Sequence, residues 1–148
     1  MKSFIYAAIV IIAVVAFYAF NNPKADFKAD KAGGIQFHRR NWNEALQLAK
    51  KENKLTFLDI YATWCGPCKR LKSITFSNKE VGKFFNANFI NIALDGEQGD
   101  GSMLASQYNL TSYPSLLFID ATGKIVTLTV GYYSPSELLE LGKSVSIQ

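Results

Sequence analysis

From residue 41 onward, hydrophobic residues recur either at helical spacing or in short unbroken runs, and the two patterns alternate. Trp42 and Ala45 begin a helical repeat, and Asn41 precedes them as a helix N-cap. The run KLTFLDIYA at 54–62 is short, apolar and aromatic, which predicts a buried strand. The same patterns predict helices at 65–76, 77–88, 102–110 and 134–145, strands at 89–94, 113–120 and 124–131, and a short strand within 34–40.

The order of these elements, β-α-β-α-α-β-α-β-β-α, predicts an α/β domain. Helices separate the early strands, so those strands are expected to pair in parallel. The strands at 113–120 and 124–131 are separated by the turn ATG alone, which predicts an antiparallel hairpin. The expected architecture is therefore one mixed central sheet flanked by helices on both faces. Ser77 or Asn78 is the expected cap of one helix, and Ser134 that of the last.

The N-terminus follows a different pattern. Residues 4–20 are 17 uncharged apolar residues, close to the lower length limit of a membrane span. We expect a transmembrane signal-anchor at 1–21, a polar tether at 22–33 and one folded domain at 34–148. A cleaved signal peptide stays open, with Val14-Val15-Ala16 as a weak cleavage site, whereas a buried core helix would need a polar face.

The orientation of this segment is not fixed by charge. Lys2 lies on one side, and Lys24, Lys28 and Lys31 on the other, so the positive-inside rule does not favour export. A very short N-terminal tail before an apolar run and a folded domain is nevertheless typical of a signal-anchor. We expect the domain outside the cytoplasm, on the periplasmic side of the inner membrane; a cytoplasmic domain on a membrane leash is the alternative.

Composition excludes several classes of protein. The net charge is +4, and residues 32–148 hold 12 Lys and Arg against 10 Asp and Glu, too balanced for a nucleic-acid binder. Two cysteines are too few for a disulfide-stapled scaffold, and with His38 as the one histidine they fall short of a zinc site. The acidic loop at 95–101 lacks the EF-hand spacing for Ca²⁺, so no metal and no organic cofactor are expected.

Both cysteines lie in the stretch ATWCGPCKRL at 62–71, between a predicted strand and a predicted helix. Two intervening residues at a helix start bring the sulfurs within bonding reach. The helix N-terminus favours a negative sulfur, so Cys65 is the expected nucleophile with a lowered pKa. Cys68, one turn further, is shielded and resolves the mixed disulfide. Pro67 stiffens the loop, Gly66 leaves an approach path for a partner backbone, and Trp64 flanks the pair.

On these residues, 34–148 resembles a thioredoxin-like domain, and WCGPC is the motif of thioredoxin itself. The region 57–85 is also similar to membrane-linked domains such as the C-terminal domain of DsbD-type reductases. The resemblance implies that Cys65 attacks, that Cys68 resolves and that Asp59 is a buried acid relaying protons behind Cys68. A carboxylate in LTFLDIY is expected to be buried with a raised pKa, although an exposed strand-end Asp is the alternative.

The resemblance also assigns a substrate-binding groove. Tyr113-Pro114 matches the cis-proline pair of the family, whose first residue offers backbone hydrogen bonds to an extended substrate. The sequence alone favours a trans proline at the start of an edge strand. Gly131 matches a glycine lining the same groove, and the following Tyr132 and Tyr133 either shape that groove or merely pack.

Two positions depart from the family pattern. Asn91 stands where the family often has a lysine near the buried acid, which implies a differently tuned proton relay. Tyr61 stands where thioredoxin commonly has tryptophan. The acidic loop at 95–101 either contacts a partner or is simply solvated, and His38, Arg39 and Arg40 are expected to form a solvated segment.

These features predict a monomeric, membrane-anchored thiol–disulfide oxidoreductase that reduces protein disulfides. Its partners would be protein substrates with disulfides, a thiol electron donor, and the membrane through residues 4–20, without nucleic acid. Within the same chemistry, a disulfide oxidase or isomerase is the alternative. From another class, a non-redox peptide-binding or chaperone-like module would use the Pro114 groove without turnover.

Overall fold

The computed structural model describes residues 11–12, 33–39 and 41–146. The expected anchor at 1–21 and tether at 22–33 therefore lie outside the described residues, apart from 11–12 and 33. In the described ranges, no helix combines the length and the apolar character that crossing a membrane requires.

The described domain is built from four strands and the helices around them. The strands are β1 (Leu55–Tyr61), β2 (Phe89–Asp95), β3 (Ser115–Ile119) and β4 (Ile125–Val130). The helices are α2 (Trp42–Glu52), α3 (Gly66–Arg70), the π-helix η1 (Leu71–Thr75), α4 (Lys79–Asn88), α5 (Gly99–Gln107) and α6 (Pro135–Ser146).

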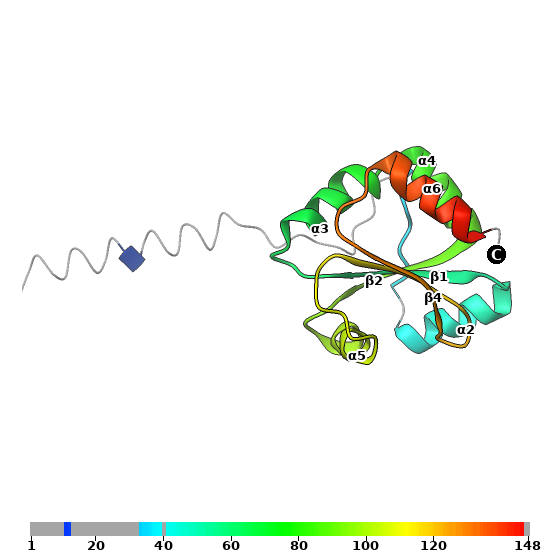
Figure 1. The fold of residues 1–148 in the computed structure, drawn as a ribbon, viewed down its shortest axis with the longest axis horizontal. Coiled ribbons are helices and arrows are strands. Elements are labelled where there is room, and N and C mark those ends of the chain that lie inside the picture. The colour runs from blue at the N-terminus through cyan, green and yellow to red at the C-terminus, as the bar shows by residue number, and fades with distance from the viewer. Residues whose placement is uncertain (1–10, 13–32, 40, 147–148) are drawn as a thin grey trace, which may run out of the picture.

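The strands form one mixed sheet in the order β2-β1-β3-β4. β1 pairs in parallel with β2, and β3 pairs antiparallel with β4, as the sequence predicts. β3 also pairs antiparallel with β1, a pairing that the sequence did not predict. Helices α3, α4 and α6 cover one face of the sheet, and α2 and α5 cover the other (Figure 1). The three-layer α/β architecture is thereby confirmed for the described part of the chain.

The helix starts follow the capping rules read from the sequence. Asn41 accepts a hydrogen bond from the Glu44 backbone amide at 2.9 Å, and Asn78 accepts one from that of Glu80, also at 2.9 Å. Ser134 makes a reciprocal capping box with Glu137: its backbone amide donates to the Glu137 carboxylate at 2.7 Å, and its hydroxyl oxygen accepts from the Glu137 backbone amide at 3.4 Å. The predicted caps are confirmed, with Asn78 rather than Ser77 serving α4.

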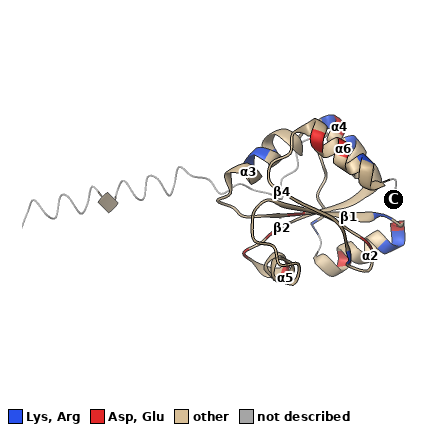
Figure 2. Ribbon diagram, in the orientation of Figure 1, with Lys and Arg blue, Asp and Glu red and all other residues tan. Residues whose placement is uncertain are grey.

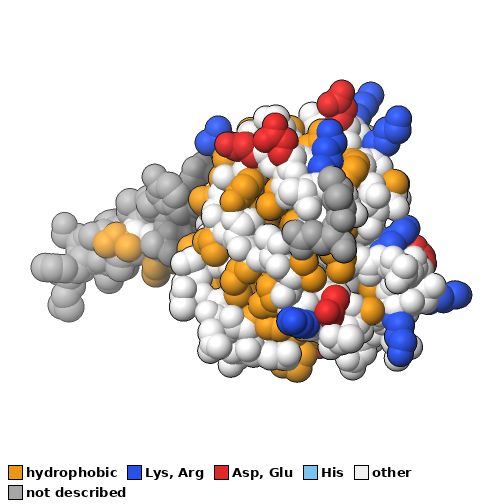
Figure 3. Space-filling model, turned by 45° about the vertical axis from the view of Figure 1, so that its right-hand side comes forward, with side chains coloured by type: hydrophobic (Ala, Val, Ile, Leu, Met, Phe, Trp, Pro, Cys, Tyr) orange, Lys and Arg blue, Asp and Glu red, His pale blue; other side chains and the backbone are white. Residues whose placement is uncertain are grey.

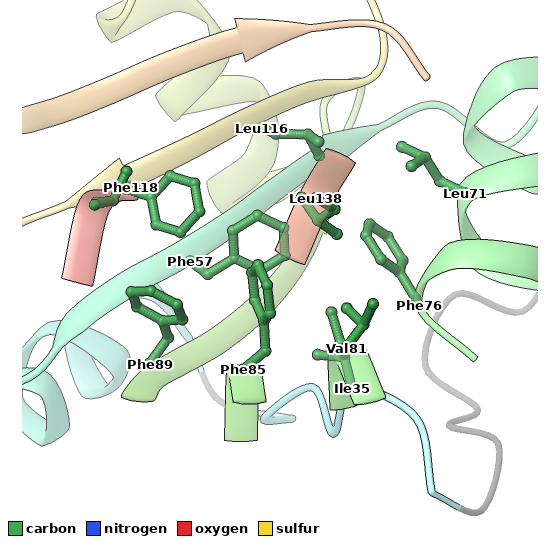
Figure 4. Close-up of a cluster of buried hydrophobic side chains, with 11 residues drawn as sticks. Ile35, Phe57, Leu71, Phe76, Val81, Phe85, Phe89, Leu116, Phe118 and Leu138 are labelled. Carbon is green, nitrogen blue, oxygen red and sulfur yellow. The ribbon is translucent and has the colours of Figure 1, made fainter. Parts of the chain in front are cut away.

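Each face of the sheet has its own apolar core. On the α3–α4–α6 face, Phe57 lies among aromatic rings, with centroids 4.8 Å from Phe85 and 5.2 Å from Phe118 (Figure 4). On the opposite face, Leu58 and Ile60 pack against α2 and α5. Successive residues of β1 point to opposite faces, so this one strand supplies both cores.

Two predictions from the sequence are wrong: one strand does not form, and one helix begins earlier than expected. No strand forms at 35–39, because the backbone amides of Ile35 and His38 donate to two separate places, the carbonyls of Phe76 and Asn91. Helix α5 begins at Gly99, so the expected loop at 95–101 is shorter than predicted. Packing drives the early start: a Cβ at Gly101 would lie 2.0 Å from the Asp95 carbonyl oxygen, so only glycine lets the helix approach β2 there.

Charged residues lie mainly on the helices and around the ends of the strands (Figure 2). On the face drawn in Figure 3, hydrophobic side chains are interspersed with these charges rather than fully covered by them. The partly exposed apolar side chains include Val126, Leu128 and Val130 of the edge strand β4.

Candidate active site

The two cysteines form a disulfide where β1 gives way to α3. The S–S distance is 2.07 Å and the two Cα atoms are 5.3 Å apart. Cys65 is the N-cap of α3, and its sulfur accepts a hydrogen bond from the backbone amide of Cys68 at 3.1 Å. Pro67 lies in the first turn, where its missing amide leaves no bond unmade. The cysteine pair thus has the N-terminal helix position that the motif predicts.

Both sulfur-bearing residues are nearly inaccessible in this disulfide form. Cys65 is 2% exposed and Cys68 is 1% exposed. Tyr61 and Ala62 form a buried cluster with them, and the partly buried Tyr113 packs against this cluster. The shielding predicted for Cys68 is present, but exposure does not distinguish it from Cys65.

Asp59 lies on the face of β1 that α3 covers, two residues before Tyr61. It is 1% exposed, so the alternative of a solvent-exposed aspartate is wrong. Its neighbours in the sheet register are Ala93 and Leu116, which offer it no charge. Burial raises the pKa of Asp59 to about 7, and one of its carboxylate oxygens accepts no hydrogen bond among the described residues. Such a group exchanges its proton near neutral pH.

The peptide bond between Tyr113 and Pro114 is cis, as the resemblance implies and against the trans alternative. The carbonyl of Pro114 accepts a hydrogen bond from the backbone amide of Gly131 at 2.9 Å. Gly131 has a φ of 101°, in the left-handed region where a side chain would be strained. These predicted groove residues are therefore brought together, with Pro114 itself buried.

Trp64 directly precedes Cys65, and its side chain is 66% exposed. Its indole nitrogen donates to the carboxylate of Glu97 at 2.9 Å, and its ring meets that of Tyr113 edge-on at 6.2 Å. Gly66 and Pro67 are exposed beside it. The sequence indicates only that Glu97 is one acid of a loop. Its contact with Trp64 could not be predicted, because no local pattern links residues 33 positions apart.

On the other side of Gly131, the two tyrosines have different environments. The guanidinium of Arg70 lies 4.3 Å from the ring centre of Tyr132, a cation–π contact. Tyr133 packs against the aromatic core, and its carbonyl accepts a hydrogen bond from Thr75 of η1 at 2.6 Å. Sequence reasoning missed Arg70 and Thr75, since both contacts cross more than 50 residues.

The positions that depart from the family pattern are buried. Asn91 is 1% exposed, and its side-chain amide donates to Asn86 at 3.2 Å. It lies two residues along β2 from Ala93, the register partner of Asp59.

His38 is exposed, and among the described residues no three His, Cys, Asp or Glu side chains are grouped so as to hold a metal ion.

Comparison with known proteins agrees with this geometry. The family model described as "Thioredoxin-like domain" matches residues 42–146, most of the chain. The chain belongs to the thioredoxin-like family. Members of this family are in general disulfide oxidoreductases, and a close cysteine pair on this fold is the corresponding feature here.

Several relatives of this thioredoxin-like protein carry disulfide chemistry in their names. The thiol:disulfide interchange protein DsbD of Tatumella citrea is 26% identical over 136 residues, covering 90% of this chain and 24% of that protein. DsbD of Haemophilus influenzae is 30% identical over 74 residues, or 49% of this chain and 13% of that protein. The chain therefore spans about a quarter or less of the length of these relatives.

Solved structures give the same fold. A solution structure of a proposed disulphide-isomerase from Bacteroides thetaiotaomicron is 39% identical, with a TM-score of 0.68, covering 80% of this chain and 97% of that one. The oxidised C-terminal domain of Neisseria meningitidis DsbD superposes with a TM-score of 0.58 at 21% identity, covering 68% of this chain and 89% of that one. The second likeness concerns the fold alone.

Proposed function

We propose that this chain is a membrane-anchored thiol–disulfide reductase acting on protein disulfides. The observation that carries the proposal is the Cys65–Cys68 disulfide at the start of a helix, with the buried carboxyl of Asp59 on the same side of the sheet. A cysteine pair that only stabilises the fold would need no group that titrates near neutral pH on the same face of the sheet.

In the proposed cycle, the reduced chain has a thiolate at Cys65 and a thiol at Cys68. The Cys65 sulfur attacks one sulfur of a substrate disulfide, the substrate S–S bond breaks, and the leaving sulfur takes up a proton. Cys68 then loses its proton and attacks the Cys65 sulfur. The substrate leaves as a dithiol, reduced by two electrons, and the chain is left with the observed disulfide.

Asp59 serves the second step of this cycle as the group that receives the Cys68 proton. A carboxyl with a pKa of about 7 is ionised in a substantial fraction of molecules at neutral pH and can return the proton easily. The apolar neighbours of Asp59 favour this role, because a strong ion pair would hold it permanently charged.

The substrate would lie as an extended segment over the cis Tyr113-Pro114 pair and Gly131, with Trp64, Gly66 and Pro67 bordering the attacking sulfur. An external dithiol must reduce the disulfide again after each turnover. The apolar run at 4–20 supports a membrane anchor, and the DsbD relatives support a domain on the periplasmic side. We further propose that 22–33 is a tether, that 34–148 is the catalytic domain and that the chain acts as a monomer.

A disulfide isomerase is the second candidate, favoured by the 39% identity to the proposed disulphide-isomerase. The Gly-Pro dipeptide between the cysteines favours the reductase, because it is the dipeptide of reducing thioredoxins. The two candidates differ in the reduction potential of the pair rather than in the residues involved.

The deciding experiment is the reduction potential of the Cys65–Cys68 couple in the full-length chain, held in detergent and equilibrated in thiol redox buffers. The exposed Trp64, adjacent to the disulfide, provides a fluorescence signal. A potential of about −250 mV or lower supports a reductase, whereas about −150 mV or higher makes the chain an oxidant or isomerase. A couple that does not exchange with the buffer at all would favour a binding module without turnover.

A further inference from the structure

Two charged residues flank the cysteine pair, each held against an aromatic ring. On one side the carboxylate of Glu97 accepts a hydrogen bond from Trp64, the residue before Cys65. On the other side the guanidinium of Arg70, two residues after Cys68, lies over the ring of Tyr132. The two pairs carry opposite charges, and Glu97 and Arg70 are both exposed.

A continuous line of contacts joins these two pairs through the predicted groove. Trp64 touches Tyr113, and Tyr113 is bonded to Pro114 through the cis peptide. The Pro114 carbonyl accepts from Gly131, whose neighbour in sequence is Tyr132. This line of contacts thus runs from Glu97 through Pro114 to Arg70.

The charged residues nearest to Glu97 and Arg70 in sequence have the same sign as these two residues. Asp95 uses its carboxylate to bind the Glu97 backbone amide at 3.0 Å and the Gln98 side chain at 3.2 Å, so it adds to the negative end. At the positive end, the exposed Lys69 adds to Arg70. The predicted groove is thus flanked by negative charge on the Glu97 side and by positive charge on the Arg70 side.

We propose that this groove selects extended, cysteine-containing polypeptide segments by charge order, with a basic residue on the Glu97 side of the cysteine and an acidic residue on the Arg70 side. The inference rests on the proposed function and names its substrate class. Attraction at both ends would favour one orientation of the segment and place its cysteine sulfur against Cys65. A segment with the two charges interchanged would meet like charges at both ends.

Two peptides of identical composition test this. One has two Lys before and two Glu after a central cysteine, and the other has the reverse order; both cysteines carry a thionitrobenzoate disulfide. Attack by the reduced full-length chain in detergent forms a Cys65–peptide disulfide and releases coloured thionitrobenzoate. Cys68 then frees the peptide thiol and closes the chain's own disulfide, so the reaction balances without another reagent.

The expected result is a rate ratio between the two peptides of about three- to tenfold at low ionic strength, as two exposed charge pairs allow. The ratio should approach one in molar salt, because exposed charges are screened there. The double variant Glu97→Lys, Arg70→Glu keeps the net charge and should reverse the preference. Glu97→Gln keeps an oxygen acceptor for Trp64 but removes the charge, so it should shrink the ratio without reversing it.

The matched control is Lys83→Glu with Glu140→Lys, an interchange of two exposed charges on α4 and α6, which should keep the natural ratio. Equal rates for both peptides in the natural chain, or a preference that survives the Glu97–Arg70 interchange, would overturn the proposal. Uncharged hydroxyethyl disulfide separates this failure from that of the proposed function. A chain that reduces it but ignores charge order lacks only the selectivity, whereas a chain that reduces neither probe is not a reductase.

Discussion

Asp59 and Asp120 are the same residue type in opposite environments. Asp59 lies within β1, sealed from water, with apolar register partners and a pKa raised to about 7 by burial. Asp120 begins the turn between β3 and β4. Hydrogen bonds from Thr122, from its hydroxyl at 2.6 Å and its backbone amide at 2.8 Å, and from the amide of Lys124 at 3.0 Å lower its pKa.

The comparison shows that the charge of one carboxylate, Asp120, stabilises the fold, whereas the charge of the other, Asp59, destabilises it. Asp120 is stabilised in its charged form by donors in its own turn, so its charge contributes to folding. Asp59 is penalised in its charged form and is not compensated by a described cation. A residue that costs stability in the middle of a strand is most simply explained by chemistry, and the cysteine pair on the same side of the sheet supplies that chemistry.

The largest expected effect tests whether thiol chemistry occurs there at all. Cys65→Ser should lower the reduction rate of protein disulfides by about a thousandfold or more, because the nucleophile is lost. Cys68→Ser should instead accumulate mixed disulfides, visible on non-reducing gels as thiol-sensitive bands. If Cys65→Ser reduced insulin as fast as the natural chain, the special environment of Asp59 would need another explanation.

The next effect concerns stability and its dependence on pH. Asp59→Asn should make the disulfide form more stable to urea at pH 8, by about 2 to 4 kcal/mol, because no charge then has to be buried. The folded pKa lies above the unfolded value of about 3.9, so the natural chain binds more protons when folded between these pH values. Its free energy of unfolding should therefore fall as pH rises from about 4 to about 7, by roughly 4 kcal/mol.

The variant should show no such slope in that window. Asp120→Asn is the matched control, because it removes the same charge from a site where the charge is favourable and should give no gain at pH 8. Unfolding free energies measured from pH 4 to pH 8 on all three proteins decide the matter. Parallel curves for the natural chain and Asp59→Asn would show that Asp59 is not titrating in the folded state.

A smaller effect is expected on the rate of the second thiol step. Without the Asp59 carboxylate, Cys68 must lose its proton to water, so the mixed disulfide should persist about 10- to 100-fold longer at pH 7. Acid quenching followed by mass spectrometry measures this lifetime after a single turnover. A lifetime in Asp59→Asn equal to that in Asp120→Asn would remove Asp59 from the proton relay.

The smallest effect belongs to the turn. Asp120→Ala should lower the free energy of unfolding at pH 7 by about 1 kcal/mol, a modest value because solvent screens these exposed bonds. The Asp120 pKa is lowered on folding, so this contribution is present above about pH 4 and is lost as pH falls through the folded pKa. The natural chain and the variant should therefore converge in acid, in a window separate from that of Asp59.

Much of the fold could be predicted because local signals agree with the tertiary structure. The helical repeat beginning at Trp42 and the apolar run of β1 each fix an element, and Asn41 and Asn78 mark helix starts by their side-chain chemistry. The errors arose where packing overrides local preference. Gly99 and Gly101 are poor helix formers, yet α5 includes both, and the missing side chain of Gly101 lets the helix lie against the carbonyl of Asp95 at the end of β2.

The site residues that lie close together in sequence could be predicted, but the contacts between residues far apart in sequence could not. The spacing of Cys65 and Cys68 and the placement of Asp59 in a buried strand are readable from one stretch of sequence. The contacts of Glu97 with Trp64 and of Arg70 with Tyr132 join residues 33 and 62 positions apart, and no periodicity encodes such pairs. Charge order around the groove is therefore visible only after folding.

The glycines at 34 and 82 have a mechanical consequence. A Cβ at Gly34 would lie 2.3 Å from the Phe76 carbonyl oxygen, and one at Gly82 would lie 2.4 Å from the Gly33 carbonyl oxygen, so main chain rests directly on main chain there. The Asn86 side chain accepts from Gln36 and donates to the Gly34 carbonyl, securing the same segment. The backbone at residues 33–34 is thus fixed directly to α4 and to Phe76, the residue after η1, so the entry of the chain into the domain is tied rigidly to the helices that follow the cysteine pair.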